Sequence, residues 1–557
     1  MSEADRETPT GDGLEQAEAA PGRGRRRWLS PASLGTALLL AIMVGAGIFA
    51  AVMVTPGPDE EALPRPADAD VVVAGAAPLS WDPAAISDSE SAQLLSQVFE
   101  GLTVLDATST LRPALAESWE VEDEGRRVVF TLREGLTFSD GSALDAADVR
   151  RSWLRVLDPA RPSPLASLLD DVEGAAAYAR GEGPADAVGL HADGRTLSVD
   201  LARPASYFPA VAAVPSLAVV PETIDELARG PRRDMTFAAS GAYVPAGGEP
   251  GELWLRANDA YWAGPPSMER ISVVTDLGGR SEVDVFEDGA VDWTRISPLD
   301  AAWIRYDQVL GPQLRHADEM VVEYLGFDTS RPPFDDARVR RAVSMAVDWD
   351  RLTAHDPAGT AAATAIVPPG VEARGQVDGR LRHDPEAARA ELAAAGYPGG
   401  EGFPAVSLAS YGIGPTAAIA QDLERELDIE VAVEERSFDD HSALLDGDTP
   451  AMWTLAWSAD YPHAHDFLGL LLRGDSSANI GGWANAAYDD LIDTAAATAD
   501  PAEQEALYEQ AQAIVREEAP LIPLSYSDSW ALSREGLRGA AVSGVGLLRF
   551  ADMAWQP

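Results

Sequence analysis

The sequence predicts an α/β protein with more than one lobe, some antiparallel strands and one N-terminal transmembrane helix. The chain has 557 residues, and at about 100–200 residues per domain this length corresponds to about three structural units. Apolar residues make up 46% of the chain, which is enough for a sizeable core. From residue 70 onward, segments with strand and helix patterns alternate, and one uncharged apolar run precedes them.

The apolar run from Leu34 to Val54 is 21 residues long. As a helix it would measure about 31 Å at roughly 1.5 Å per residue, and a bilayer core is about 30 Å thick. Arg25 to Arg27 precede it, and arginines next to a span stay in the cytoplasm. A cleaved signal peptide is the alternative, although its apolar core is usually only about 7–15 residues long. The expected N-terminal segments are a disordered cytoplasmic tail (1–31), a transmembrane anchor (32–54) and a linker (55–69).

The charge composition excludes several kinds of chemistry. The formal net charge is −48, all 42 basic residues are arginine, and there is no cysteine. Disulfides, thiol nucleophiles, cysteine-ligated metals, Schiff-base lysines and P-loop lysines are therefore impossible. So acidic a chain repels phosphate backbones, and we expect no nucleic-acid partner. Genomic base bias and adaptation to high salt are both open explanations for the missing lysine.

The first part of the body has the patterns of several strands and two helices. Asp70 to Ala74 is a β-branched run typical of a strand buried on both faces. Ser89 to Gly101 places its apolar residues on one helical stripe, and Ala146 to Val156 follows a capping residue, Asp145. Further strands are expected at 115–121, 127–132, 188–191 and 196–201, the last two joined by a tight turn.

The second part of the body contains a strand–helix–strand unit. Its members are Val406 to Tyr411, Ile419 to Leu427 and Ile429 to Val433, the order of a βαβ unit with parallel strands. Other strands are expected at 321–327, 452–457 and 521–526, and helices at 338–347, 385–395, 486–498 and 501–518.

Five motifs appear in a fixed order along the chain. They are Leu111 to Val121 (LRPALAESWEV), Phe130 to Gly135 (FTLREG), Leu325 to Thr329 (LGFDT), Trp457 to Pro462 (WSADYP) and Pro520 to Leu524 (PLIPL). Together they resemble the peptide/nickel family of extracellular solute-binding proteins, over about residues 70–540. The resemblance implies a two-lobed periplasmic-binding-protein fold with an extra subdomain in lobe I. The implied borders are 70–297 and 520–557 for lobe I, about 105–200 for its subdomain, and 298–519 for lobe II.

The resemblance also implies a ligand-binding site around Asp460. In peptide-binding relatives, the acidic residue of the Trp-x-x-Asp motif pairs with the free α-amino group of the ligand. A turn-capping role before Tyr461-Pro462 is the alternative. The backbone of Ala456 to Ser458 would pair with an extended peptide. Trp457 would line a side-chain pocket or, alternatively, belong to the core. Tyr461 and Asn479 complete the expected ligand-binding residues.

One departure from the family pattern follows this motif. Relatives commonly continue with Asp-Pro-Asp, whereas this chain has His463-Ala464-His465-Asp466. Two histidines at this spacing make His463 and His465 weak metal candidates, because imidazole nitrogens can be metal ligands. A pair of loop histidines with ordinary hydrogen bonds is the favoured alternative. We therefore expect no metal and no cofactor.

The function implied by the resemblance is that of a receptor without enzymatic activity. It would capture peptides between its lobes and deliver them to an ABC import permease. It would be a monomer held in the cell membrane by a single span, with its C-terminal body outside the cytoplasm. Oligosaccharides, opines and metal chelates are alternative solutes. A ligand-sensing surface protein without a permease is the alternative class of function.

Overall fold

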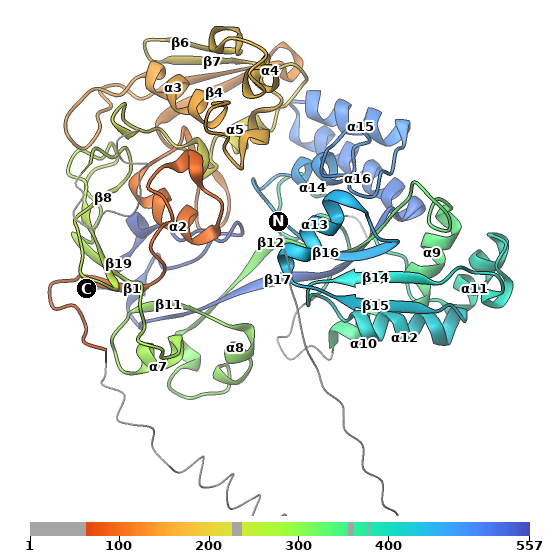
Figure 1. Ribbon diagram of the computed structural model, residues 1–557. Helices are drawn as coiled ribbons and strands as arrows, with labels where there is room; N and C mark the ends of the chain where they lie inside the picture. The colour runs from red at the N-terminus through yellow and green to blue at the C-terminus, as the bar shows by residue number, and fades with distance from the viewer. Residues whose placement is uncertain (1–62, 225–236, 355–360, 377–378, 557) are drawn as a thin grey trace, which may run out of the picture. The chain divides into compact units, whose positions relative to one another are not determined.

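The computed structural model describes residues 63–224, 237–354, 361–376 and 379–556 of the protein (Figure 1). The expected tail, the anchor and most of the linker fall in residues 1–62, outside this described part. Within the described part, no helix is both long enough and apolar enough to cross a bilayer. Residues 62–557 form one compact unit.

An eleven-stranded sheet is the framework of this unit. Its order is β15-β14-β16-β12-β17-β11-β1-β10-β9-β8, with β13 beside β17. The strands β12 and β17 form a central antiparallel pair. On one side of it, β14 is parallel to β15 and β16, and on the other side β1 is parallel to β10 and β11. The strands are β1 (Val71–Ala74), β8 (Tyr243–Pro245), β9 (Glu252–Ala257), β10 (Arg270–Val274), β11 (Trp293–Ile296), β12 (Leu314–Phe327), β13 (Ala361–Ala362), β14 (Val406–Ser410), β15 (Val431–Glu435), β16 (Met452–Ser458) and β17 (Leu521–Ser533).

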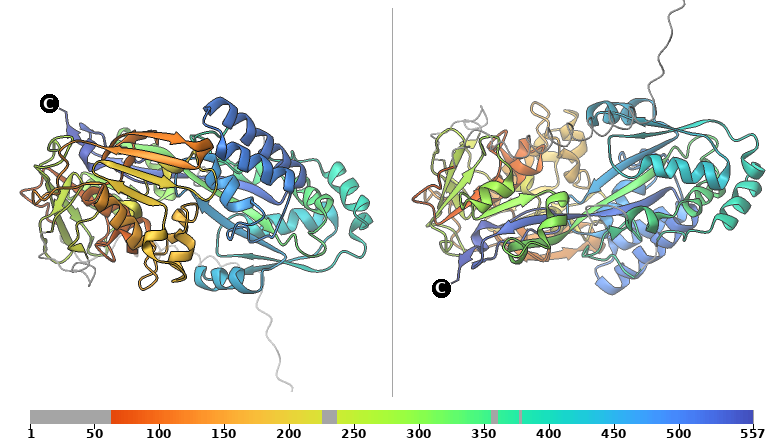
Figure 2. Two further views of the ribbon diagram at one scale, coloured as in Figure 1. Left: turned by 90° about the horizontal axis from the view of Figure 1, so that it is seen from above. Right: turned by 90° about the horizontal axis from the view of Figure 1, so that it is seen from below.

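The central pair, β12 and β17, connects the two halves of the sheet. The strands are 14 and 13 residues long and lie side by side in all views (Figures 1 and 2). β12 also pairs with β16, and β17 also pairs with β11. Their register runs to the pair Asp318–Asp528, shifts, and resumes at Val322–Tyr526. Such a shift bends and twists a strand pair locally.

A separate antiparallel sheet, with the order β4-β5-β7-β6, packs against α3. The helix begins with a capping box, in which the Ala147 N–H donates to Asp145 at 2.8 Å and the Asp145 N–H donates to Asp148 at 3.0 Å. Trp153 on its inner face is fully buried in the core of this sheet. The strands of this sheet and of two short ribbons are β4 (Ala116–Glu122), β5 (Arg127–Leu132), β6 (Leu190–Asp193), β7 (Thr196–Asp200), β2 (Thr103–Leu105), β3 (Leu111–Pro113), β18 (Leu537–Arg538) and β19 (Ala554–Trp555).

The helices pack around these sheets and bury their apolar faces in several contiguous cores. They are α2 (Ser89–Val98), α3 (Ala146–Val156), α4 (Ala175–Ala179), α5 (Phe208–Val211), α7 (Glu282–Glu287), α8 (Pro298–Ile304), α9 (Ala337–Ala346), α10 (Trp349–Ala354), α11 (Pro385–Ala394), α12 (Thr416–Leu427), α13 (Phe438–Gly447), α14 (Ala464–Leu472), α15 (Ala486–Ala497) and α16 (Pro501–Glu518).

Most expected elements are confirmed within a few residues. The βαβ unit is present, since β14 and β15 are parallel and α12 lies between them in the chain. Several elements were not expected, among them β8, β9, β10, β11, α13 and α14. Among the expected strands, β12 and β17 differ most, since they were expected only at 321–327 and 521–526. Their additional halves carry His316, Asp318 and Asp528, and such polar residues interrupt the apolar pattern that predicts a strand.

Candidate ligand-binding site

Asp460 lies in the short loop that joins β16 to α14. The loop is fixed by backbone hydrogen bonds, in which the Ala459 N–H donates to the Met320 carbonyl at 2.9 Å and the His463 N–H donates to the Tyr461 carbonyl at 2.8 Å. The β16 strand ends at Ser458, and α14 begins at Ala464 with His463 as its N-terminal cap. The sequence therefore places the partly buried Asp460 at the carboxyl end of a central strand.

The end of β16 has one free edge, meaning an edge without a partner strand among the described residues, although the Ala456 backbone bonds to the Tyr411 side chain. Ala456, Trp457 and Ser458 pair with β12 on one side, through Glu323, Val322 and Val321. On the other side β16 pairs with β14 only at Met452 and Trp453. In the part of the chain that the structure describes, no strand covers the second edge of Ala456 to Ser458. Unpaired backbone groups at such an edge can bind an added strand.

A pocket of about 430 Å³ lies in front of this loop. Ser458, Ala459 and Asp460 form one wall, and the opposite walls come from segments 86–105, 164–165, 210–218 and 543–549. Most of the lining is apolar, including Ile86, Phe99, Leu105, Leu165, Val214 and Leu547. The charged groups at the pocket are Asp88, Glu100, Asp460 and Arg549. A solute with an apolar body and a cationic group suits such a lining.

Behind Asp460 lies a second pocket of about 300 Å³. Trp457, Tyr461 and His465 line it from the same loop and the flanking elements, together with Tyr207 and Arg473. Asp460 is the member of the loop that reaches both pockets, whereas Ser458 reaches only the first of them. Asp460 therefore borders both pockets, and its carboxylate is available to a group in either.

The carboxyl groups of Asp460, in the loop, and of Asp466, in the first turn of α14, have raised pKa values. Burial raises the pKa of Asp460 from 3.8 to about 6. Asp466, the second carboxylate, is fully buried, and the indole N–H of Trp457 donates to its Oδ2 at 2.9 Å. Burial, and then the neighbouring Asp460 carboxylate, raises the pKa of Asp466 against this hydrogen bond. Both carboxyl groups are thus costly to keep ionised, and a cation bound near Asp460 would relieve that cost.

A third carboxylate, Glu100, lines the opposite wall of the first pocket. It is buried and accepts hydrogen bonds from the Tyr261 hydroxyl at 2.6 Å and the Trp262 indole N–H at 2.5 Å. Arg549 lies 3.8 Å away. Burial raises the pKa of Glu100, although Arg549 and both hydrogen bonds oppose this effect. Neither Glu100 nor Arg549 was predicted to belong to the site. The available signals are a glutamate directly after the buried Val98 and Phe99, and a lone arginine between Leu548 and Phe550.

The two histidines after Asp460 are held inside the protein. The Nδ1 atom of His463 accepts the His465 backbone N–H at 3.2 Å, and its Nε2 lies 3.0 Å from Gln504 Oε1. Burial lowers the pKa of His463 to about 4 and also lowers the pKa of His465. His465 bonds to the Tyr461 hydroxyl at 3.1 Å and stacks on Tyr207 with ring centroids 3.8 Å apart. With both ring nitrogens engaged, His463 has no free lone pair for a metal ion.

The remaining expected site residues, Ala456 and Asn479, line neither pocket. Ala456 lies on the free edge of β16 but lines neither pocket. Asn479 is held by its amide, which donates to the carbonyls of Arg473 at 3.2 Å and Trp483 at 2.6 Å. The structure therefore brings Asp460, Ser458, Trp457 and Tyr461 together at the loop and places Asn479 in a separate turn.

Comparison with known proteins places this geometry in a family. The model described as "Bacterial extracellular solute-binding proteins, family 5 Middle" matches residues 110–479. The Escherichia coli protein YgiS, named a probable deoxycholate-binding periplasmic protein, is 30% identical over 81% of this chain and 86% of its own. The Bacillus subtilis dipeptide-binding protein DppE is 27% identical over 86% of this chain and 90% of its own.

Solved structures share the fold. The unliganded open form of the murein tripeptide-binding protein MppA matches with a TM-score of 0.75 and 23% identity, over 89% of this chain and 99% of that one. OppA of Burkholderia pseudomallei matches with a TM-score of 0.70 and 24% identity, over 88% and 100% of the two chains. These matches confirm the expected α/β two-lobed periplasmic-binding-protein fold. With the family match over residues 110–479, they show that the chain belongs to family 5 of the bacterial extracellular solute-binding proteins.

Proposed function

We propose that this protein is a receptor that captures a peptide with a free α-amino group. The observation that carries the proposal is the position of Asp460, a desolvated carboxylate in the pocket wall at the end of the free β16 edge. The peptide ammonium would pair with Asp460, and its backbone would extend β16 at Ala456 to Ser458. Trp457 and Tyr461 would line the space behind the carboxylate, and Asn479 would support the site from outside the pockets.

Delivery to an ABC permease and attachment to the membrane are part of the same proposal. Lobe I would comprise 70–297 and 520–557, with its subdomain at about 105–200, and lobe II would comprise 298–519. The apolar run at 32–54 would hold the protein in the membrane as a single-pass monomer with its body outside the cytoplasm. Full-length protein retained in washed membranes at its unprocessed mass would support the anchor. A mature form in the medium that begins near residues 50–60 would contradict it.

A second candidate ligand is an amphipathic carboxylic acid with a rigid apolar body. The largely apolar lining of the first pocket favours it, as does Arg549, which could pair with a carboxylate. The relative named for deoxycholate binding has this chemistry in its ligand. Such a ligand would use Arg549 and would not need Asp460, so the two candidates predict opposite effects of the two substitutions.

Identification of the co-purified ligand by mass spectrometry tests the proposal directly. The same full-length protein is then stripped of ligand and screened by thermal shift against peptide mixtures and a bile acid. A ligand at 100 times its Kd adds about 2.7 kcal/mol to the stability of the protein. Stabilisation by peptides that is lost in Asp460→Asn but kept in Arg549→Gln would support the peptide receptor. Stabilisation by the bile acid alone, lost in Arg549→Gln, would overturn it.

A further inference from the structure

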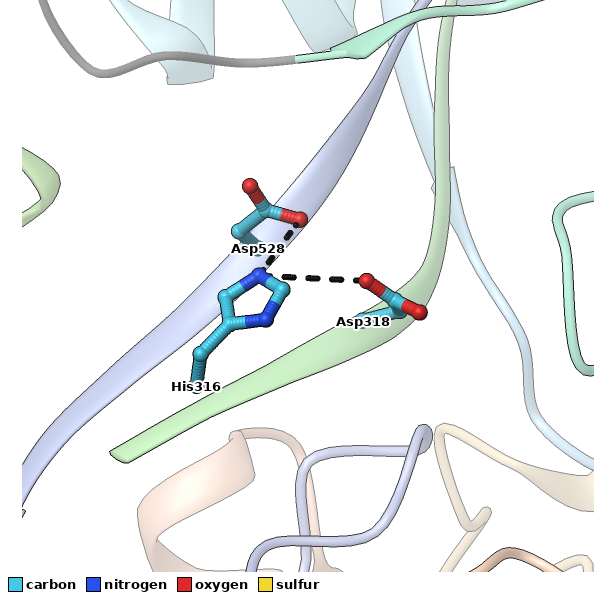
Figure 3. A group of neighbouring side chains, drawn as sticks. All are labelled: His316, Asp318 and Asp528. Carbon is cyan, nitrogen blue, oxygen red and sulfur yellow. Dashed lines mark ion pairs between the residues drawn. The ribbon is translucent and has the colours of Figure 1, made fainter.

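Three potential metal ligands come together on the central strand pair. His316 and Asp318 lie two residues apart on β12 and so point to the same face of the sheet, and Asp528 on β17 is directly opposite Asp318. The His316 Nε2 atom is 3.2 Å from Asp528 Oδ1 and 3.8 Å from Asp318 Oδ1 (Figure 3). One ligand atom from each residue lies within 4.8 Å of the others.

The separations between these atoms match those around a metal ion. Zinc binds imidazole nitrogen and carboxylate oxygen at about 2.0–2.1 Å, and in a tetrahedral site this places the ligand atoms about 3.3 Å apart. The distances of 3.2 and 3.8 Å from His316 Nε2 are close to this value. The Asp318 side chain is 70% accessible, so a small rotation could bring its carboxylate oxygen to the tetrahedral separation from His316 Nε2.

The charges at the cluster are unbalanced without a cation. Carboxylates directly opposite each other on paired strands repel. Among the described residues, no arginine lies within 4 Å of Asp318 or Asp528. The arginine Arg305 lies over the Trp530 ring, and the centroid of that ring is 4.4 Å from the centroid of the His316 ring. Arg305 therefore faces the tryptophan and forms no ion pair with the two carboxylates. In contrast, Asp200 faces His191 at 3.0 Å but also pairs with Arg127 at 2.7 Å.

The ligand set indicates the class of ion. One imidazole nitrogen with two carboxylate oxygens suits divalent transition metals and zinc, whereas calcium and magnesium prefer oxygen ligands alone. The partial exposure of His316 and Asp318 leaves space for water to complete the coordination. The chain has no cysteine, so no thiolate competes for the ion.

We propose that His316, Asp318 and Asp528 bind a divalent transition-metal ion that links β12 to β17. The site lies directly before the register shift between Asp318 and Val322, on the two strands that join the halves of the main sheet. A bound ion would fix the pairing of these strands on one side of the shift. This inference does not depend on which solute the pocket near Asp460 binds.

The test measures zinc binding by calorimetry on the full-length, chelator-treated protein near neutral pH. Excess magnesium is present to occupy sites made only of carboxylates. We expect one zinc ion per chain, with affinity lowered about tenfold or more in His316→Gln and in Asp528→Asn. His191→Gln is the matched control and should bind zinc as the unchanged protein does, because its carboxylate partner already has an arginine. Cobalt(II) should give visible absorption bands in the unchanged protein that are absent in His316→Gln.

Three results would overturn the proposal. They are no zinc binding in excess magnesium, binding that His316→Gln leaves unchanged, and an equal loss in His191→Gln. Melting temperatures of all variants without metal separate lost binding from lost folding, and Asp318→Asn provides a second, more exposed substitution that should not disturb the fold. Peptide binding is measured on the same samples with and without chelator. Failure of the metal site would therefore leave the peptide proposal unaffected, and the reverse also holds.

Discussion

Glu100 and Asp460 line the same pocket, and burial raises the pKa of both carboxyl groups. They differ in the hydrogen-bond and charge partners that the protein gives them. Glu100 accepts two short hydrogen bonds and has Arg549 at 3.8 Å. Asp460 has no arginine within 4 Å among the described residues, and burial is the cause of its raised pKa. Glu100 is therefore satisfied by the protein itself, whereas Asp460 has no such partner in the described part of the chain, and it is the carboxylate that we propose a ligand cation satisfies.

The largest difference should appear in stability. Glu100→Ala removes the acceptor of the Tyr261 hydroxyl and of the Trp262 indole N–H, and each donor left unpaired costs about 1–3 kcal/mol. Arg549 loses its contact with Glu100 and keeps Asp552 as its carboxylate partner among the described residues, at 3.5 Å. Asp460→Asn removes a carboxylate that is costly to keep ionised, so the free energy of unfolding at pH 7 should stay equal or rise. Chemical denaturation of both variants without ligand measures the contrast. Equal destabilisation by the two substitutions would remove the proposed distinction.

The second difference should appear in affinity. Asp460→Asn keeps the size of the side chain and removes the charge, which should weaken binding of a free-amino peptide by about 10- to 150-fold, or about 1.5–3 kcal/mol. The N-acetylated peptide should bind the unchanged protein poorly, and the variant should discriminate less between the two peptides. This crossed comparison separates direct pairing from general loss of packing. If both proteins bind the free-amino peptide equally well, Asp460 is only a turn cap.

The raised pKa of Asp460 makes a prediction about pH. A carboxyl group whose pKa is raised from 3.8 to about 6 stabilises the ligand-free fold below pH 3.8, and this contribution is lost as the pH rises through 6. Pairing with an ammonium requires the ionised form, so peptide affinity should fall about tenfold between pH 7 and pH 5. Titration calorimetry at both pH values checks this, with Asp460→Asn expected to be nearly independent of pH. A flat profile in the unchanged protein would contradict the prediction.

Features set by neighbouring residues could be predicted from the sequence, whereas contacts between residues far apart in the chain could not. Asp145 and Asp148 carry their capping signal within one turn, so the start of α3 could be predicted. Asp460 could be proposed as a ligand-binding residue because its motif is continuous in sequence. Glu100 meets Tyr261, Trp262 and Arg549 only through the fold, and no local pattern records such a contact. The burial that raises the pKa of Asp460 likewise comes from tertiary packing.

The smallest expected effect concerns how the Asp460 loop is held. The Trp457 indole N–H donates to Asp466 at 2.9 Å, and the Asp460 carboxylate raises the pKa of Asp466, so the two carboxyl groups interact. Trp457→Phe keeps an aromatic ring and removes this bond, which should cost about 1 kcal/mol in the free energy of unfolding. If the bond also positions the loop, peptide affinity should fall by about fivefold, because 1 kcal/mol corresponds to that factor.

Trp303→Phe is the matched control, since the exposed Trp303 makes the same type of bond to Asp300 at 3.4 Å. The control should change neither quantity measurably. An unchanged affinity in Trp457→Phe, with the expected loss of stability, would show that this bond supports the core and that Asp460 is positioned by the backbone of its loop alone.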